Sequence, residues 1–304
     1  MLALAVVVWG ITPRITAVAG PHTDPLLLTT LRSLPTALFL LAALPILRYR
    51  MPHSRAVWGW TAVSGLMMVT IFLGGFTEAI IRAGPGIASV LGSTPPFFVA
   101  LLGRIFLGDR VAPRTVVGLL VGFVGIVLMA SSQLSSGNDA GDTALGMAFA
   151  IGASLGWAVG TLLVKELLQR HPETDLIGLT TGQYIVGGLA LLVLALPIEG
   201  TGGTDWSSSD LWLSIAFISI VGSAIATIAY FGALRRLSAT TVTAWLFLAP
   251  VVTVLLEIVL GHMPKPLVLA GMAITVAGVA IVNTAGAAPV PMEPQPEGAG
   301  GTAG

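Results

Sequence analysis

The chain has 304 residues, of which 55% are hydrophobic and only 9% are charged. A soluble globular protein carries about a quarter charged residues, so a chain this apolar is predicted to fold in a lipid bilayer. The net charge is zero and no run of Lys and Arg occurs, which argues against a nucleic-acid partner. The absence of cysteine excludes disulfides and thiolate sites, and we expect no metal ion and no cofactor.

The N-terminus enters apolar sequence at once, from Met1 to Trp9. A secretory signal normally begins with a basic region and ends in a cleavage site. No basic residue precedes this apolar run. It therefore predicts a first span that stays in the membrane, with a cleaved signal as the alternative.

Apolar stretches long enough to cross a membrane follow one another along the chain. A membrane-crossing helix needs about 20 mainly apolar residues, and ten stretches meet that length. They predict an all-α polytopic membrane protein with ten transmembrane helices, joined by short loops into antiparallel pairs. The predicted spans are residues 3–19, 26–47, 57–81, 86–107, 113–131, 145–165, 176–196, 211–233, 239–261 and 267–285.

Basic residues predict the orientation, because Lys and Arg concentrate on the cytoplasmic side of membrane proteins. With the N-terminus inside, most of the 14 Lys and Arg side chains fall at cytoplasmic loops and helix ends. Both termini are therefore predicted to be cytoplasmic. The cytoplasmic group is Arg48, Arg50, Arg55, Arg104, Arg110, Arg114, Lys165, Arg170, Arg235 and Arg236.

The two halves of the chain resemble each other. At a constant shift of 153 residues, Pro113 matches Pro266, and Gly118 matches Gly271. Each half holds five spans, an odd number, so the halves enter the membrane in opposite directions, as in many secondary transporters. We expect a first five-helix repeat at 1–131, an extracytoplasmic linker at 132–144, a second repeat at 145–285 and a disordered cytoplasmic tail at 286–304.

Particular residues in this order resemble the ten-helix permeases of the EamA type, in the drug/metabolite transporter superfamily. They are Trp9-Gly10, Arg32, the stretch from Pro95 to Leu128 with Leu107-Gly-Asp-Arg110, Gly118 and Gly125, and a second set with Ala233–Ala239, Pro250, Leu260-Gly261, Gly271 and Gly278. The resemblance covers residues 1–285. It implies export of small metabolites across a bacterial cytoplasmic membrane. The family usually has an acid after Leu-Gly in both halves, whereas here the second half has His262-Met263.

Prolines within the fourth and ninth spans mark candidate residues of the translocation path. Proline removes a backbone hydrogen bond, which is tolerated in a membrane where the freed carbonyl faces protein or a wet cavity. Either a kink beside the substrate path or a packing kink would explain them. The candidates on the two helical stripes are Ser93 and Pro96 on the fourth span, and Pro250, Thr253 and Glu257 on the ninth.

Charged residues inside the spans are the second group of candidates, because an ionised group there is costly unless it is paired or wet. Glu257 is either a proton-coupling or substrate-binding carboxylate, or the partner of Lys265 or Arg32. Arg32 either binds a substrate carboxylate or phosphate, or pairs with Glu78 or Glu257. Glu78 and Arg82 have the spacing of a local ion pair.

Aromatic and amide side chains complete the candidate path. Tyr184 occupies the place of Arg32 in the second repeat, beside Gln183. With Trp157, Tyr230 and Trp245 they would line a cavity for amphipathic or aromatic molecules. The alternative for each aromatic is an interface anchor or core packing.

These observations favour a secondary transporter that exports small metabolites, such as amino acids or related compounds, by alternating access. No nucleotide-binding signature occurs, so H⁺ or another coupling ion is a candidate partner beside the substrate and the bilayer. The alternatives are a membrane-embedded lipid-modifying enzyme or a non-transporting membrane partner or sensor. The first needs clustered acids or His-rich motifs and the second a sizeable soluble domain. Neither occurs, so we expect no enzyme.

Overall fold

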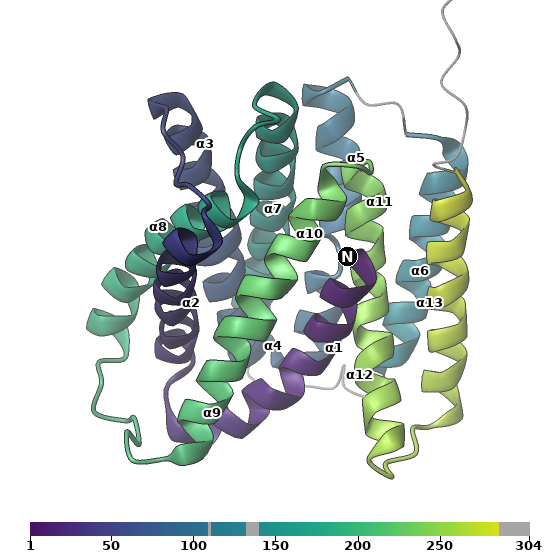
Figure 1. Ribbon diagram of the computed structural model, residues 1–304. Helices are drawn as coiled ribbons and strands as arrows, with labels where there is room; N and C mark the ends of the chain where they lie inside the picture. Colours follow the sequence, from purple (N-terminus) through teal and green to yellow (C-terminus); the bar gives the residue numbers. More distant parts are fainter. Residues whose placement is uncertain (109–110, 132–139, 286–304) are drawn as a thin grey trace, which may run out of the picture.

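The computed structural model describes residues 1–108, 111–131 and 140–285, and every element in this part of the chain is a helix (Figure 1). Ten of the helical segments are long and apolar enough to cross a membrane, which confirms the predicted fold class. The first half contains α1 (Leu2–Ala19), η1 (Gly20–His22), α2 (Pro25–Leu47), α3 (Arg55–Gly65), η2 (Leu66–Gly74), α4 (Gly75–Gly92), α5 (Pro95–Phe106) and α6 (Pro113–Ala130). The second contains α7 (Ala140–Arg170), α8 (Leu176–Ile198), α9 (Ser209–Phe217), η4 (Ile218–Ile225), α10 (Ala226–Leu234), α11 (Ala239–Ala244), η5 (Trp245–Phe247), α12 (Leu248–Val259) and α13 (Pro266–Ala285).

The helix starts follow from local chemistry. Proline occupies the first turn of α2, α5 and α6, where its missing N–H has no helical partner to lose. Serines accept hydrogen bonds from first-turn N–H groups at α3, α9 and α11. The sixth span is longer than predicted, at Ala140–Arg170 instead of 145–165, because its polar last turn stays helical with an ion pair between Glu166 and Arg170.

The third and eighth spans each contain a wide helical turn of the π type, at Leu66–Gly74 and Ile218–Ile225. Such turns are rare, and they occur most often at functional sites. The fourth and ninth spans are interrupted instead. The fourth breaks between Gly92 and Pro95, and the ninth passes through the three-residue helix η5 before α12.

Extended contacts between helices hold the bundle together. α2 packs along α8, and α6 packs along α13. α1 packs against α10 and α12, while α7 packs against α4 and α5. The two ends of the bundle differ in their loops. The upper end in Figure 1 carries residues 48–54, 171–175 and 235–238, and the lower end carries 20–24, 199–208 and 260–265.

Candidate functional site: a cavity between the spans

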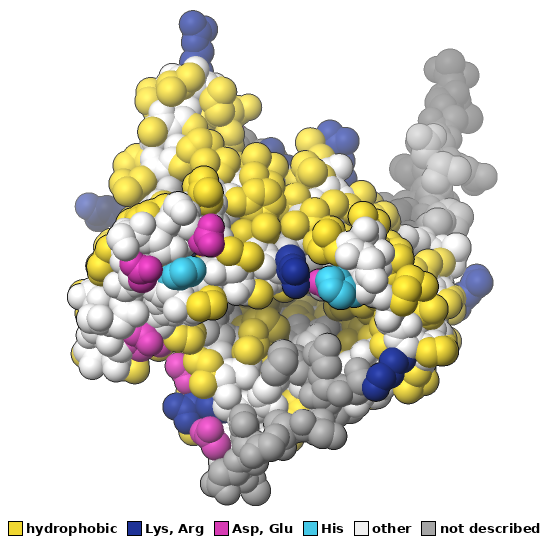
Figure 2. Space-filling model, turned by 90° about the horizontal axis from the view of Figure 1, so that it is seen from below, with side chains coloured by type: hydrophobic (Ala, Val, Ile, Leu, Met, Phe, Trp, Pro, Cys, Tyr) yellow, Lys and Arg dark blue, Asp and Glu magenta, His cyan; other side chains and the backbone are white. Residues whose placement is uncertain are grey.

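A cavity of about 690 Å³ lies between the spans and opens at the lower end of the bundle. Figure 2 shows this end from below, with a hollow in which hydrophobic side chains are visible. The volume is within the range of small-molecule sites, about 300–1,000 Å³. In the first five spans most lining residues come from the halves near the lower end, such as Thr16 on α1 and Thr29 on α2, while Trp9 and Met68 lie deeper. Trp157 and Tyr184 line the cavity deeper in the bundle.

The structure brings most of the candidate path residues to this cavity and leaves the others outside its lining. The lining includes Arg32, Ser93, Trp157, Gln183, Tyr184, Pro250 and Thr253. Glu78, Pro96, Tyr230, Trp245 and Glu257 are not among the lining residues. At the fourth-span break, Pro95 lines the cavity and the neighbouring Pro96 is buried in the first turn of α5.

Arg32 is the only charged side chain among the described residues that line the cavity. Its Nη2 donates a hydrogen bond to Ser223 Oγ at 3.2 Å, and its buried Nε has no partner within the described chain. The predicted pairing with Glu78 or Glu257 is wrong, because both acids bind other bases. A charge left uncompensated in a low-dielectric site costs several kcal/mol, so an anionic ligand would be stabilised here.

The wide turn η4 fixes the backbone that carries Arg32. Ser219 Oγ donates to the Arg32 carbonyl at 2.9 Å, and Thr36 Oγ1 donates to the Ser219 carbonyl at 3.1 Å. A wide turn releases carbonyls from the regular helical ladder, so side chains of the neighbouring helix can bind them. η4 thus supplies both the anchor for the α2 backbone and the single hydroxyl, Ser223, that contacts the guanidinium.

The aromatic rings of Trp9, Phe72 and Trp157 form the floor of the cavity. The ring centroid of Trp157 lies 5.5 Å from that of Trp9 and 4.6 Å from that of Phe72, and the Tyr230 ring packs against both tryptophans at 5.4 Å. Trp9 Nε1 donates to the Gly222 carbonyl at 2.9 Å, and the buried Trp157 lies against the ring of Tyr230. The predicted path residue Tyr230 lies behind this floor, fully buried and bonded to Thr161 at 3.1 Å.

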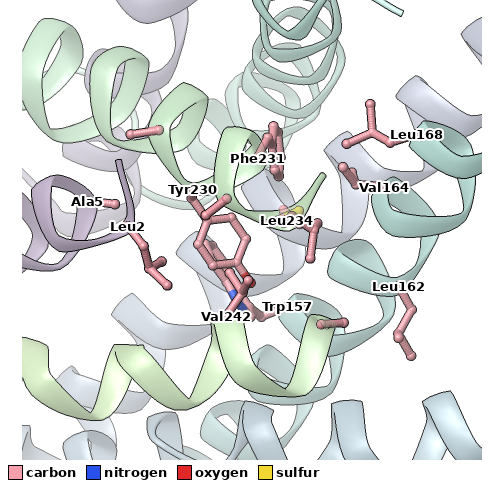
Figure 3. Packing of buried hydrophobic residues seen from close by; sticks show 14 of the residues in the cluster. Leu2, Ala5, Trp157, Leu162, Val164, Leu168, Tyr230, Phe231, Leu234 and Val242 are labelled. Atoms are coloured by element: carbon pink, nitrogen blue, oxygen red, sulfur yellow. The ribbon is translucent and has the colours of Figure 1, made fainter. Parts of the chain in front are cut away.

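A buried apolar cluster lies between these aromatic residues and the upper end of the bundle. Leu2, Leu162, Leu234 and Val242 belong to it, and they come from α1, α7, α10 and α11 (Figure 3). Figure 3 shows Tyr230 and Trp157 in contact at the centre of this cluster. A close-packed apolar cluster of this kind excludes water. The cavity is therefore open to one end of the bundle and sealed from the other.

Hydroxyl and amide groups line the walls. Tyr184 Oη lies 3.3 Å from Thr227 Oγ1, and Gln183 Nε2 donates to Ser64 Oγ at 2.7 Å. Thr29 Oγ1 lies 3.1 Å from Thr77 Oγ1, across the gap between α2 and α4. A lone Thr within a span carries no sequence pattern that would predict its place in the lining. Thr12 and Thr16, which also line the cavity, lie four residues apart on one face of α1, and that spacing is a signal of a polar stripe.

Glu257 lies outside the cavity, near the lower end of α12. Its carboxylate is 3.6 Å from Arg14 Nη1 and 3.3 Å from His262 Nδ1. The predicted alternative, a pair with a basic group, is therefore present, but the partner is Arg14 and not Lys265 or Arg32. Arg14 reaches Glu257 because α1 packs directly on α12, with Thr253 Oγ1 donating to the Gly10 carbonyl at 2.7 Å.

Two further candidates have structural partners away from the cavity. Glu78 pairs with Arg82 at 3.0 Å, as the spacing predicted, and Arg82 also contacts Asp142 at 2.7 Å. This cluster joins α4 to the first turn of α7. Trp245 packs on the apolar cluster and donates from its Nε1 to Asn283 Oδ1 at 2.9 Å. Neither Glu78 nor Trp245 contributes to the lining.

Comparison with known proteins gives matches along nearly the whole chain. A model of the EamA-like transporter family matches residues 1–131 and 144–284. The uncharacterized transporter YvbV of Bacillus subtilis is 26% identical over 286 residues, which cover 93% of this chain and 90% of YvbV. The uncharacterized inner membrane transporter YedA of Escherichia coli is 28% identical over 258 residues, covering 84% of this chain and 80% of YedA.

Two further matches extend the comparison. A probable amino-acid metabolite efflux pump of Salmonella typhimurium is 25% identical over 290 residues, covering 91% of this chain and 92% of the pump. A solved crystal structure has the same fold, with a TM-score of 0.79 at 20% identity, over 94% of this chain and 96% of that one.

Proposed function

Because the chain belongs to the EamA-like transporter family, we propose that it is a secondary transporter that exports small metabolites, such as amino acids or related compounds. The observation that carries this proposal is the cavity, which is open at the lower end and sealed at the upper end by the aromatic floor and the apolar cluster. A carrier works by opening such a cavity to each side in turn. The described conformation corresponds to one of these two states.

An inverted repeat supports alternating access, because exchanging the conformations of two equivalent halves converts one state into the other. The wide turns η2 and η4 lie at corresponding places in the third and eighth spans. Gly108 and Gly261, 153 residues apart, both have a positive φ, of 69° and 89°, just after a helix end. The contacts of α1 with α10 and α12 correspond to those of α7 with α4 and α5.

The distribution of basic residues supports the orientation of the proposed carrier. Arg48, Arg170 and Arg235 lie at the upper end, whereas Asp205 and Asp210 lie at the lower end. We therefore place the upper end in the cytoplasm, both termini inside, and the open cavity on the outer side of the cytoplasmic membrane. At the lower-end loop, hydrogen bonds from Ser207 and the nearby His22 lower the pKa of Asp205, which keeps this outer carboxylate charged.

The proposal is tested first by metabolite profiling. Cells that carry wild-type protein and cells with an empty vector are compared by mass spectrometry of the medium and of the cell contents over time. We expect one class of small metabolite to leave the wild-type cells faster. Equal profiles for the two strains over a broad metabolite pool would overturn the export proposal.

We propose Glu257 as the coupling carboxylate, with H⁺ as the coupling ion. It lies beside Arg14 and His262 at the outer rim, where proton binding to the carboxylate would weaken both contacts between α12 and its neighbours. A pH difference of one unit across the membrane corresponds to 1.36 kcal/mol per proton. If one proton is exchanged for each substrate molecule, this free energy sustains about a tenfold ratio between the substrate concentrations on the two sides. In proteoliposomes loaded with the exported metabolite, we expect wild type to reach about that concentration ratio and Glu257→Gln to reach a ratio near one.

The matched control is Arg14→Gln, which removes the ion pair and keeps the carboxylate. We expect it to retain much of the response to the pH gradient, because the carboxylate still binds a proton and still contacts His262. We expect all three proteins to exchange labelled for unlabelled substrate without a gradient. If Arg14→Gln loses the gradient response as fully as Glu257→Gln does, the role of Glu257 is structural.

A further inference from the structure

We propose that the cavity selects organic monoanions, with one carboxylate at Arg32 and an apolar body, and that it disfavours zwitterions of the same shape. The inference rests on the proposed carrier function and narrows its substrate class from amino acids and related compounds to those related compounds that lack an ammonium group. Three observations on the described residues carry it: the charge of the lining, the Arg32 donor left without a partner, and the composition of the walls.

The charge of the lining is the first observation. Arg32 gives the described part of the lining a single positive charge. The acids nearest the lower end are already engaged: Glu257 with Arg14 and His262, and Glu78 with Arg82. Glu199 accepts from the backbone N–H groups of Leu26 and Leu27, at 3.0 and 2.7 Å, at the start of α2. A monoanion would neutralise the lining, whereas a zwitterion would leave its charge uncompensated.

The unpartnered donor is the second observation. Arg32 Nε is buried, has no hydrogen-bond partner in the described chain and belongs to a residue that lines the cavity. A guanidinium nitrogen only donates. A carboxylate only accepts, so it complements this group. An ammonium would bring further donors, and the described lining offers it neutral acceptors only, such as the threonine hydroxyls and the Gln183 amide, without a carboxylate.

The composition of the walls is the third observation. Beside the polar groups, the lining contains Met68, Phe72, Phe76, Ile126 and Leu246. Aromatic rings and methionine accommodate an aryl or alkyl body at low cost. The cavity thus combines a fixed cation, an unpaired donor on that cation and apolar lining residues, which together fit an amphipathic carboxylate.

The test uses three probes with the same phenylpropyl skeleton: 3-phenylpropanoate, L-phenylalanine, which adds an ammonium, and neutral 3-phenylpropanamide. Each is titrated into the purified full-length protein in lipid nanodiscs, with calorimetry as the readout. We expect wild type to bind 3-phenylpropanoate at least tenfold more tightly than either of the other probes. A charge-assisted hydrogen-bonded pair in a buried site supports a difference of this size.

Substitution of Arg32 assigns the preference to its side chain. Arg32→Gln is expected to bring the affinity for 3-phenylpropanoate down to that for the amide, while Arg32→Lys keeps the charge and part of the preference. Arg55→Gln, at the exposed start of α3, is the matched control and should leave all three affinities unchanged. Size-exclusion profiles establish that each variant is folded.

Three outcomes would overturn the inference: phenylalanine bound as tightly as 3-phenylpropanoate, a preference that survives Arg32→Gln in full, or no binding of any probe. None of them decides the carrier proposal, which metabolite profiling tests without a chosen probe. Export of a zwitterion in that assay would uphold the carrier and reject the substrate class.

Discussion

A cysteine introduced at Ala17 is expected to react with a membrane-impermeant thiol reagent added outside the cell, and a cysteine at Ala5 is not. Both positions lie on α1, and the natural chain has no cysteine that would give a background signal. Ala17 lines the open cavity, whereas Ala5 is 0% exposed within the apolar cluster that seals the upper end. The two variants therefore sample the two sides of the proposed barrier on one helix.

The expected difference in labelling rate is large. If the alternative state is a minor one, populated at about 0.1–10%, Ala5→Cys should react from outside at least tenfold more slowly than Ala17→Cys. In inverted membrane vesicles, where the reagent meets the cytoplasmic side, Ala5→Cys should react whenever the protein adopts the state that is open to the cytoplasm. Labelling is measured by the mass shift of the intact protein. Equal outside rates would contradict the seal, and reaction of Ala17→Cys from the cytoplasmic side alone would reverse the proposed orientation.

Gly278→Ala is expected to destabilise the protein by about 1–3 kcal/mol, the usual cost of overpacking a close helix contact. A Cβ at Gly278 would lie 2.5 Å from the Gly122 Cα and 2.7 Å from the Gly118 carbonyl oxygen. Backbone cannot move aside as a flexible side chain can, so α6 and α13 would have to separate. Small residues allow this close approach, which stabilises helix pairs in membranes by van der Waals contact.

The matched control is Gly152→Ala on α7, because a Cβ there would meet nothing within 4 Å. Both positions are helical, so the gain in helix propensity is the same and only the contact differs. We expect Gly278→Ala to lower the temperature of half-unfolding in detergent, as followed by size-exclusion chromatography after heating. Gly152→Ala should leave it unchanged or raise it. A Gly278→Ala protein as stable as wild type would show that the helix pair tolerates separation.

The ten spans were predictable because each needs only a long apolar run, and the bilayer permits few alternatives to a helix. The ends of α7 were predicted short, since a helix that projects beyond the bilayer is polar and carries no apolar signal. The wide turns at Leu66–Gly74 and Ile218–Ile225 could not be predicted. A π-type turn holds more residues than a regular helical turn, and contacts with neighbouring helices stabilise it, so the sequence of the turn itself shows no pattern.

The cavity residues were predictable in part, and the reason differs from residue to residue. Arg32, Gln183 and Tyr184 line the cavity, because polar groups within a span avoid lipid and turn to the interior. Tyr230 and Trp245 also turn inward but pack behind the lining, and a sequence does not distinguish these two layers. Partners were the least predictable feature: Glu257 binds Arg14 and His262, which depends on how α1 lies across α12. The predicted tail at 286–304 lies outside the described residues.

The crossing of α6 and α13 determines which parts of the molecule are free to move. Thr275 Oγ1 on α13 donates to the Gly122 carbonyl at 3.4 Å on α6, and Gly118 and Gly125 meet Gly278 and Gly271 on either side of this point. With backbone against backbone, these two helices have no room to slide or tilt against each other. They form a rigid pair at one side of the bundle. In the proposed carrier, opening and closing falls to the other helices around the cavity, which move relative to this pair while the separation of α6 and α13 stays constant.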